Sequence, residues 1–185
     1  MAPGVQPQQG DVLLVVDVLN DFEHDDGEKL LASFRERAAA MRESIRLVRA
    51  AGIPVVYVND DLGRWDSDAP QLGRDAAKGR GGDMVGTLLP ERGDRVLLKQ
   101  RYSAFDHTPL EILLESLQAE RVLLIGAATE GCIVQTAIDA RERGLKASII
   151  ADACASTDPG LEAIALEYAE QVGGIRIERS GINGR

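Results

Sequence analysis

The chain has 185 residues, 44% of them hydrophobic and 28% charged, which is the composition of one globular domain with its own core. Its formal net charge of −9 disfavours binding to nucleic acid or to an anionic membrane, and no apolar run is long enough to span a bilayer. Two cysteines are too few for a disulfide scaffold, so we expect a protein of the reducing cytoplasm. Residues 1–10 lack the features of a signal peptide, and we expect them to be a disordered lead-in to a single domain over 11–185.

The first half of the domain alternates apolar runs with one amphipathic stretch. Residues 11–18 and 53–60 are β-branched runs typical of buried strands, and acidic residues lie near the end of each. Between them, residues 29–51 have apolar side chains at helical spacing, and Gly52 ends the pattern. Residues 61–94 contain many Gly, Asp and Arg, so we expect a long excursion there with little regular structure.

The second half of the domain repeats a strand-then-helix order. The expected strands are 95–100, 121–128, 146–152 and 174–179, and the expected helices are 108–117, 130–143 and 159–172. Continuous apolar strands that alternate with helices are typical of a parallel sheet buried on both faces. The sequence therefore predicts an α/β fold, a doubly wound three-layer α/β/α sandwich with a mainly parallel six-stranded sheet.

An acid, a lysine and a thiol fall at the carboxyl ends of three expected strands, where such folds bind ligands. Asp17 ends the first strand, Lys99 ends the third, and Cys132 lies in the first turn of the helix after the fourth. A helix N-terminus, with Thr129 as a plausible N-cap, favours a thiolate, and a carboxylate within reach can take the thiol proton. The N–H groups at and just before Cys132 can form an oxyanion hole. These residues indicate acyl transfer at an amide-like carbonyl through a thioester.

Each of these residues also has a purely structural interpretation. A cysteine early in a helix is often buried filler, an aspartate at a strand end is often a loop cap, and a lysine can simply reach solvent. Convergence at one sheet edge favours chemistry. Cys154 lies between alanines just past a strand, and we expect it to be a buried structural thiol. Trp65, in the excursion, can be a lid over a pocket or a patch on the core.

Three ordered motifs resemble those of the isochorismatase-like cysteine hydrolase superfamily. They are VVDVLNDF (15–22), LLKQRYSAFDHTPLEILL (97–114) and LIGAATEGCIVQTAIDARERG (124–144), and the resemblance covers roughly 11–177. It implies Asp17 as base, Lys99 as cationic partner and Cys132 as nucleophile. It also implies a cis peptide between Ala127 and Ala128, with the N–H groups of Ala128 and Cys132 forming the oxyanion hole.

The resemblance also suggests a small-molecule pocket and an oligomer. The expected pocket residues are Asn20, Phe22, Asn59, Trp65, Tyr102 and Thr129. Superfamily members usually form dimers or tetramers, so we expect a homodimer or a homotetramer here.

Departures from the superfamily pattern narrow the expected chemistry. The nicotinamidase branch holds a metal through an Asp-x-His after the second strand, but no histidine lies between His24 and His107, so we expect no metal and no cofactor. Vinyl-ether-cleaving isochorismatases generally lack the cysteine. We therefore expect hydrolysis of an amide, ureido or lactam-like C–N bond. The alternatives are a vinyl-ether hydrolase, a non-catalytic binding protein, and an aspartyl phosphatase, which would need an acid where Leu19 stands.

Overall fold

A computed structural model describes residues 3–61, 63 and 68–181 of the chain. Within these residues, the strands are β1 (Asp11–Val16), β2 (Val55–Asp60), β3 (Arg95–Lys99), β4 (Arg121–Ala127), β5 (Lys146–Ala155) and β6 (Arg176–Glu178). The helices are α1 (Gly27–Ala50), α2 (Ala69–Ala76), α3 (Gly82–Val85), α4 (Leu110–Ser116), α5 (Val134–Glu142) and α6 (Pro159–Gln171), and a π-helical turn η1 (Thr129–Ile133) precedes α5.

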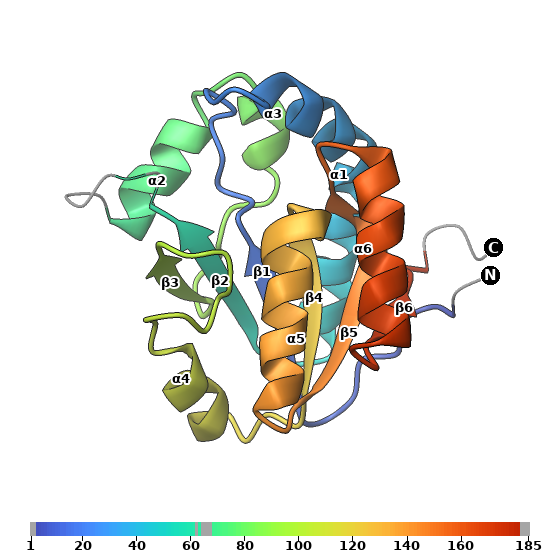
Figure 1. The fold of residues 1–185 in the computed structure, drawn as a ribbon. Coiled ribbons are helices and arrows are strands. Elements are labelled where there is room, and N and C mark those ends of the chain that lie inside the picture. Colours follow the sequence, from blue (N-terminus) through green and yellow to red (C-terminus); the bar gives the residue numbers. More distant parts are fainter. Residues whose placement is uncertain (1–2, 62, 64–67, 182–185) are drawn as a thin grey trace.

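The strands form one sheet in the order β3-β2-β1-β4-β5-β6, and every neighbouring pair is parallel. α1 covers one face of the sheet, and α4, α5 and α6 cover the other; Figure 1 shows α5 and α6 in front of the strands and α1 behind them. The predicted doubly wound, three-layer α/β/α fold is confirmed. The chain reverses its direction across the sheet between β1 and β4, so the carboxyl ends of these two strands form the switch point.

The central strand explains why the sheet has two apolar faces. All six residues of β1 are buried. Leu13 and Val15 pack in one cluster with Phe34 of α1, whereas Leu14 and Val16 pack in the other with residues of α5. Side chains alternate along a strand, so an uninterrupted apolar run fills both cores at once.

The excursion contains more regular structure than the sequence predicts. It forms α2 and α3, and α2 begins where the Asp68 carboxylate accepts a hydrogen bond from Gln71 N at 2.7 Å. An N-cap aspartate followed by Pro70 is an ordinary helix start signal, which the surrounding glycines obscured. Trp65, expected in the pocket or on the core, lies outside the described residues.

Two elements differ from their expected bounds near the switch point. β5 continues to Ala155 because β4 has a register shift between Leu124 and Gly126, after which Ala127 pairs with Ala155. The helix expected over 130–143 is divided into η1 and α5. Both differences lie where the chain bends to form the candidate site.

The described residues before β1 contact the domain. Val5 is buried, its N–H donates to Arg179 O at 2.8 Å, and Arg121 donates to Gln6 O at 2.9 Å. In the described part of the chain, every helix is too short or too polar to cross a membrane.

Candidate active site

The switch point requires a very close approach of β4 to β1. Gly126 has a φ of +124°, and a Cβ at this position would lie 1.9 Å from Val16 O. Only glycine tolerates both conditions. Gly126 therefore lets β4 run against the end of β1 and brings the chain after β4 close to Asp17.

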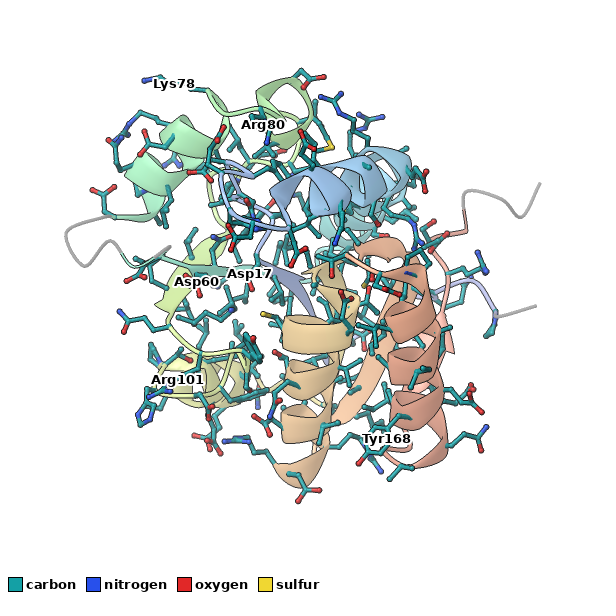
Figure 2. The ribbon with its side chains drawn as sticks, turned by 45° about the horizontal axis from the view of Figure 1, so that its top comes forward. Asp17, Asp60, Lys78, Arg80, Arg101 and Tyr168 are labelled. Carbon is teal, nitrogen blue, oxygen red and sulfur yellow. The ribbon has the colours of Figure 1, made fainter. Side chains whose placement is uncertain are left out.

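Asp17, just beyond β1, has a strained backbone conformation, and each of its two carboxylate oxygens has a partner. Its φ is +51°, a left-handed value that is uncommon outside glycine and that recurs at functional sites. Asp60 N donates to its Oδ1 at 2.6 Å, and Lys99 Nζ lies 2.7 Å from its Oδ2. Figure 2 shows Asp17 and Asp60 side by side. Both partners come from the neighbouring strands β2 and β3, where Asp60 and Lys99 are paired in register.

Lys99 joins the acid to the thiol. The residue is only 2% exposed, and its ammonium contacts Asp17 Oδ2, Arg101 O at 2.9 Å and Cys132 Sγ at 3.5 Å. These three contacts match the three protons of an ammonium group. Burial alone would lower the pKa of Lys99, but the negative charge of the adjacent Asp17 carboxylate outweighs it and raises the pKa. Lys99 is therefore a permanent cation between the two groups.

The surroundings of the Cys132 thiol favour its protonated form. Burial and the adjacent Asp17 carboxylate raise the pKa of Cys132 to about 12, although Lys99 opposes the shift. The expectation that the helix N-terminus favours a thiolate stays a prediction, which this raised pKa opposes. Burial also raises the pKa of Asp17, which makes it a stronger base. The geometry suits transfer of the thiol proton to Asp17 during attack rather than before it.

Two polar contacts fix the turn that carries Cys132. Thr129 was expected to be the N-cap of this turn, but Ala128 takes that position. The Thr129 hydroxyl is buried and lies 3.1 Å from both Ala155 O and Glu162 Oε1. The Glu130 carboxylate accepts hydrogen bonds from Thr157 N at 2.9 Å and Thr157 Oγ1 at 2.6 Å. These bonds attach η1 to the segment between β5 and α6. The Ala127–Ala128 peptide bond is cis.

A cavity of about 650 Å³, a volume suited to a small molecule, opens on the Asp17 side of this constellation, and neither Lys99 nor Cys132 is among its lining residues. Asn20, Asn59 and Tyr102, three of the expected pocket residues, line it together with Asp17 and Ala128. Two expected pocket residues do not. Phe22 is buried and packs edge-to-face on Phe34, and Thr129 points to β5 and α6.

Sequence reasoning missed several residues of the cavity wall. They are Leu19, Asp21, Glu23, His24, Asp26, Leu30, Asp60 and Thr157. Most of them follow the first motif directly, so the segment after Asn20 was the available signal. No signal in the sequence indicated Thr157, because its position at the cavity depends on its hydrogen bond to Glu130.

Among the described residues, no group of three or more His, Cys, Asp or Glu could hold a metal ion.

Asn59 connects the ends of β1 and β2. Its side chain is buried; its Oδ1 accepts from Leu19 N at 2.8 Å, and its Nδ2 donates to Leu19 O at 3.1 Å and Asp60 O at 2.9 Å. The same corner presents the Asp60 N–H to Asp17. Asn59 thus sets the backbone that orients the carboxylate.

Comparison with known proteins agrees with this fold. Residues 11–179 match the model of the Isochorismatase domain. An uncharacterized isochorismatase family protein of Bacillus subtilis, YaaI, is 31% identical, over 86% of this chain and 88% of the relative. A ureidoacrylate amidohydrolase of Methylorubrum extorquens is 30% identical, over 80% of this chain and 71% of the relative.

Solved structures give the same result. The crystal structure of N-carbamoylsarcosine amidase from Thermoplasma acidophilum is similar with a TM-score of 0.70 at 29% identity, over 92% of this chain and 96% of that one. The nicotinamidase of Staphylococcus aureus has a TM-score of 0.70 at 25% identity, over 93% of this chain and 100% of that one. The chain belongs to the isochorismatase family. Within that family it is a hydrolase, as the sequence predicts.

Proposed function

We propose that this protein is a cysteine hydrolase that cleaves an amide, ureido or lactam-like C–N bond of a small molecule through a thioester. The observation that carries the proposal is the position of the Lys99 ammonium, which contacts both the Asp17 carboxylate and the Cys132 sulfur. The similar ureidoacrylate amidohydrolase, N-carbamoylsarcosine amidase and nicotinamidase, each named for cleavage of a C–N bond, support the choice of bond.

The proposed cycle uses one proton acceptor twice. Asp17 takes the thiol proton as Cys132 Sγ attacks the substrate carbonyl carbon, and the N–H groups of Ala128 and Cys132 stabilise the oxyanion. The C–N bond then breaks, and protonated Asp17 gives its proton to the leaving nitrogen. Water attacks the thioester while Asp17 accepts one water proton; the acid leaves, and the thiolate regains that proton. Lys99 stabilises the negative charge on Asp17 and on the sulfur throughout.

The remaining features of the proposal follow from this chemistry. The cycle balances without a cofactor, and its partner is a small molecule rather than nucleic acid or membrane. A nucleophilic thiol has to stay reduced, so we place the protein in the cytoplasm. A homodimer or homotetramer is the proposed assembly, by resemblance to other members of the family.

Screening small primary amides and ureides for ammonia release tests the proposal. We expect turnover by the wild type, loss of at least about a thousandfold in Cys132→Ala, and retained turnover in Cys154→Ala. Cys154 is a suitable control because its thiol is fully buried, whereas Cys132 is partly exposed. Mass spectrometry of the stopped reaction is expected to find the acyl adduct on Cys132.

Three results would contradict the proposal. Equal alkylation of Cys132 and Cys154 by iodoacetamide would remove the distinction between the two thiols. Full turnover by Cys132→Ala would exclude the thioester. Magnesium-dependent release of phosphate from generic esters, without release of ammonia from any amide, would favour the aspartyl phosphatase.

A further inference from the structure

The turn that carries Cys132 has an uncommon backbone. η1 is a π-helical turn, in which Ile133 N donates to Ala128 O at 3.2 Å, five residues back along the chain. Such turns are rare, and they occur frequently at functional sites. Because η1 begins directly after Ala128 and contains Cys132, a shift of this turn would move the sulfur and the nearby backbone N–H groups relative to each other.

A buried carboxylate from a different helix holds the start of this turn. Glu162 lies in the first turn of α6, where the helix dipole favours a negative charge, and it is only 8% exposed. Its Oε1 lies 3.1 Å from the hydroxyl of Thr129, the fully buried first residue of η1. The single hydroxyl proton has a second acceptor in Ala155 O, also at 3.1 Å. The carboxylate is the stronger acceptor of the two, because it is charged.

Arg37 of α1 reaches this carboxylate from the opposite face of the sheet (Figure 1). Its Nη2 lies 3.1 Å from Glu162 Oε2, and its Nη1 donates to Ala151 O at 2.8 Å and to Cys154 O at 3.0 Å. Both carbonyls lie where β5 loses and regains register with β4. Arg37 therefore ties the carboxylate to the irregular part of β5 and supplies the opposite charge that a buried carboxylate requires.

We infer that Glu162 is a positioning residue of the proposed hydrolase and that it acts through Thr129. The inference rests on the proposed function, because the groups that it positions are the nucleophile and the oxyanion-binding N–H groups of that reaction. Glu162 is not among the residues that line the cavity beside Asp17, so its effect has to pass through another group. It fixes η1 before the substrate arrives, and a misplacement of about 1 Å at a reacting group costs about 10²-fold in rate.

Two changes at Thr129 separate the role of its hydroxyl from the role of its shape. Thr129→Val removes the hydroxyl and keeps nearly the same shape, and we expect kcat for ammonia release to fall about 30- to 100-fold while KM changes less than about twofold. Thr129→Ser keeps the hydroxyl and should retain kcat to within about threefold of the wild type. Equal losses in the two variants would assign the effect to packing of the methyl group and would overturn the inference.

Glu162→Gln and a matched control test the carboxylate itself. Glu162→Gln removes the charge that Arg37 holds, and we expect kcat to fall about tenfold. Glu178→Gln makes the same change in a glutamate that is 5% exposed and lies 3.6 Å from Arg121, the first residue of β4, whereas η1 follows the other end of that strand. Both variants should melt at a lower temperature, but only Glu162→Gln should lose kcat. An equal loss of kcat in the control would reduce the effect to general destabilisation and refute the assignment.

A double variant tests whether the two residues act as one unit. Thr129→Val combined with Glu162→Gln should lose no more kcat than Thr129→Val alone, because the carboxylate has nothing left to hold once the hydroxyl is gone. Multiplied losses would show that Glu162 acts independently of Thr129, and the inference would fail.

A binding measurement keeps failure of the inference distinct from failure of the proposed reaction. Butanal adds reversibly to a thiol: the sulfur bonds to the carbonyl carbon, and the thiol proton passes to the carbonyl oxygen, which the oxyanion-binding N–H groups stabilise. Iodoacetamide alkylates the sulfur at a saturated carbon and needs no such groups. Thr129→Val and Glu162→Gln should therefore weaken the protection of Cys132 by butanal about tenfold, while alkylation without butanal changes less than about threefold.

The outcomes of this measurement separate the two claims. If protection weakens as expected but no amide is hydrolysed by the wild type, the proposed function fails and the positioning role stands. If amides are hydrolysed and both folded variants bind butanal and turn over like the wild type, the inference is wrong. Equal losses in alkylation and in protection would show a change in the thiol alone, which also contradicts it.

Discussion

β1 and β4 have a buried ionic cluster at each end, and the two clusters differ in what surrounds them. At the amino ends, Arg121 forms a two-bond ion pair with Asp11, at 2.7 and 2.6 Å, and lies 3.6 Å from Glu178. At the carboxyl ends, Lys99 pairs with Asp17 at 2.7 Å and also contacts a thiol. The first cluster is enclosed by protein, whereas the second borders a cavity.

This difference separates a structural ion pair from a reactive one. The rigid guanidinium of Arg121 binds both carboxylate oxygens of Asp11, which fixes the geometry of the pair. Lys99 uses a point charge on a flexible stem, so the same ammonium can follow negative charge as it moves between Asp17 and Cys132. Burial raises the pKa values of both Asp17 and Cys132, which favours a proton on this second site.

The largest effect on stability is expected at the amino-end cluster. Arg121→Met leaves the buried Asp11 carboxylate without its cation, while Glu178 keeps only its 3.8 Å contact with Arg176, and we expect the free energy of unfolding to fall by about 3–5 kcal/mol in urea titrations. Arg95→Met is the matched control, since Arg95 also begins a strand but is exposed, and should change stability by less than about 0.5 kcal/mol. The folded fraction of Arg121→Met should keep its kcat/KM; loss of activity there would contradict the separation of the two clusters.

Among the two buried cations, the larger loss of activity is expected on replacing Lys99, at the carboxyl ends of the strands. Lys99→Met removes the charge that stabilises the developing thiolate, and kcat should fall by about 10²- to 10³-fold in the ammonia assay. Stability should fall less than in Arg121→Met, because Asp17 already has a raised pKa and can take up a proton once its partner is gone. Lys146→Met, an exposed lysine that begins β5, serves as control. Unchanged turnover in Lys99→Met would remove lysine from the mechanism.

How far the sequence predicted this arrangement depends on whether a contact follows from the regular order of the strands or from a local irregularity of the chain. The strand ends were readable because Asp17 and Lys99 each close an apolar run, and parallel strands bring such ends together. The position of Thr157 in the cavity wall could not be predicted from the sequence, because it depends on a hydrogen bond to Glu130 and on the register shift in β4. Phe22 and Thr129 were placed in the pocket by resemblance, but packing turned both inward. Motif residues therefore predicted the chemistry better than the cavity wall.

The pH dependence of alkylation distinguishes a resting thiol from a resting thiolate. Because the pKa of Cys132 is about 12, the rate of iodoacetamide labelling should keep rising about tenfold per pH unit to pH 10. The same cysteine in urea should level off near an ordinary thiol pKa of about 8.5. A plateau near neutral pH in the native protein would show a preformed thiolate.

Asp17→Asn sharpens this test because it separates the two effects of the carboxylate. The charge of Asp17 raises the pKa of Cys132, so its removal should lower that pKa and speed alkylation at a given pH. Turnover should nevertheless be lost, since the asparagine cannot accept the proton. If alkylation and turnover fell together, Asp17 would act by holding the thiol in place rather than as a base.

The smallest effect is expected from Asn59→Ala, which touches neither the thiol nor the lysine. It removes three hydrogen bonds at the corner that presents the Asp60 N–H to Asp17, and a looser corner should lower kcat by about tenfold through misorientation. A purely structural defect would lower the folded fraction without moving the pH profile. The hydrogen bond from Asp60 lowers the pKa of Asp17, so weakening it should shift the acid limb of kcat/KM to higher pH. A lower kcat with an unmoved acid limb would show that Asn59 supports the fold alone and does not position the base.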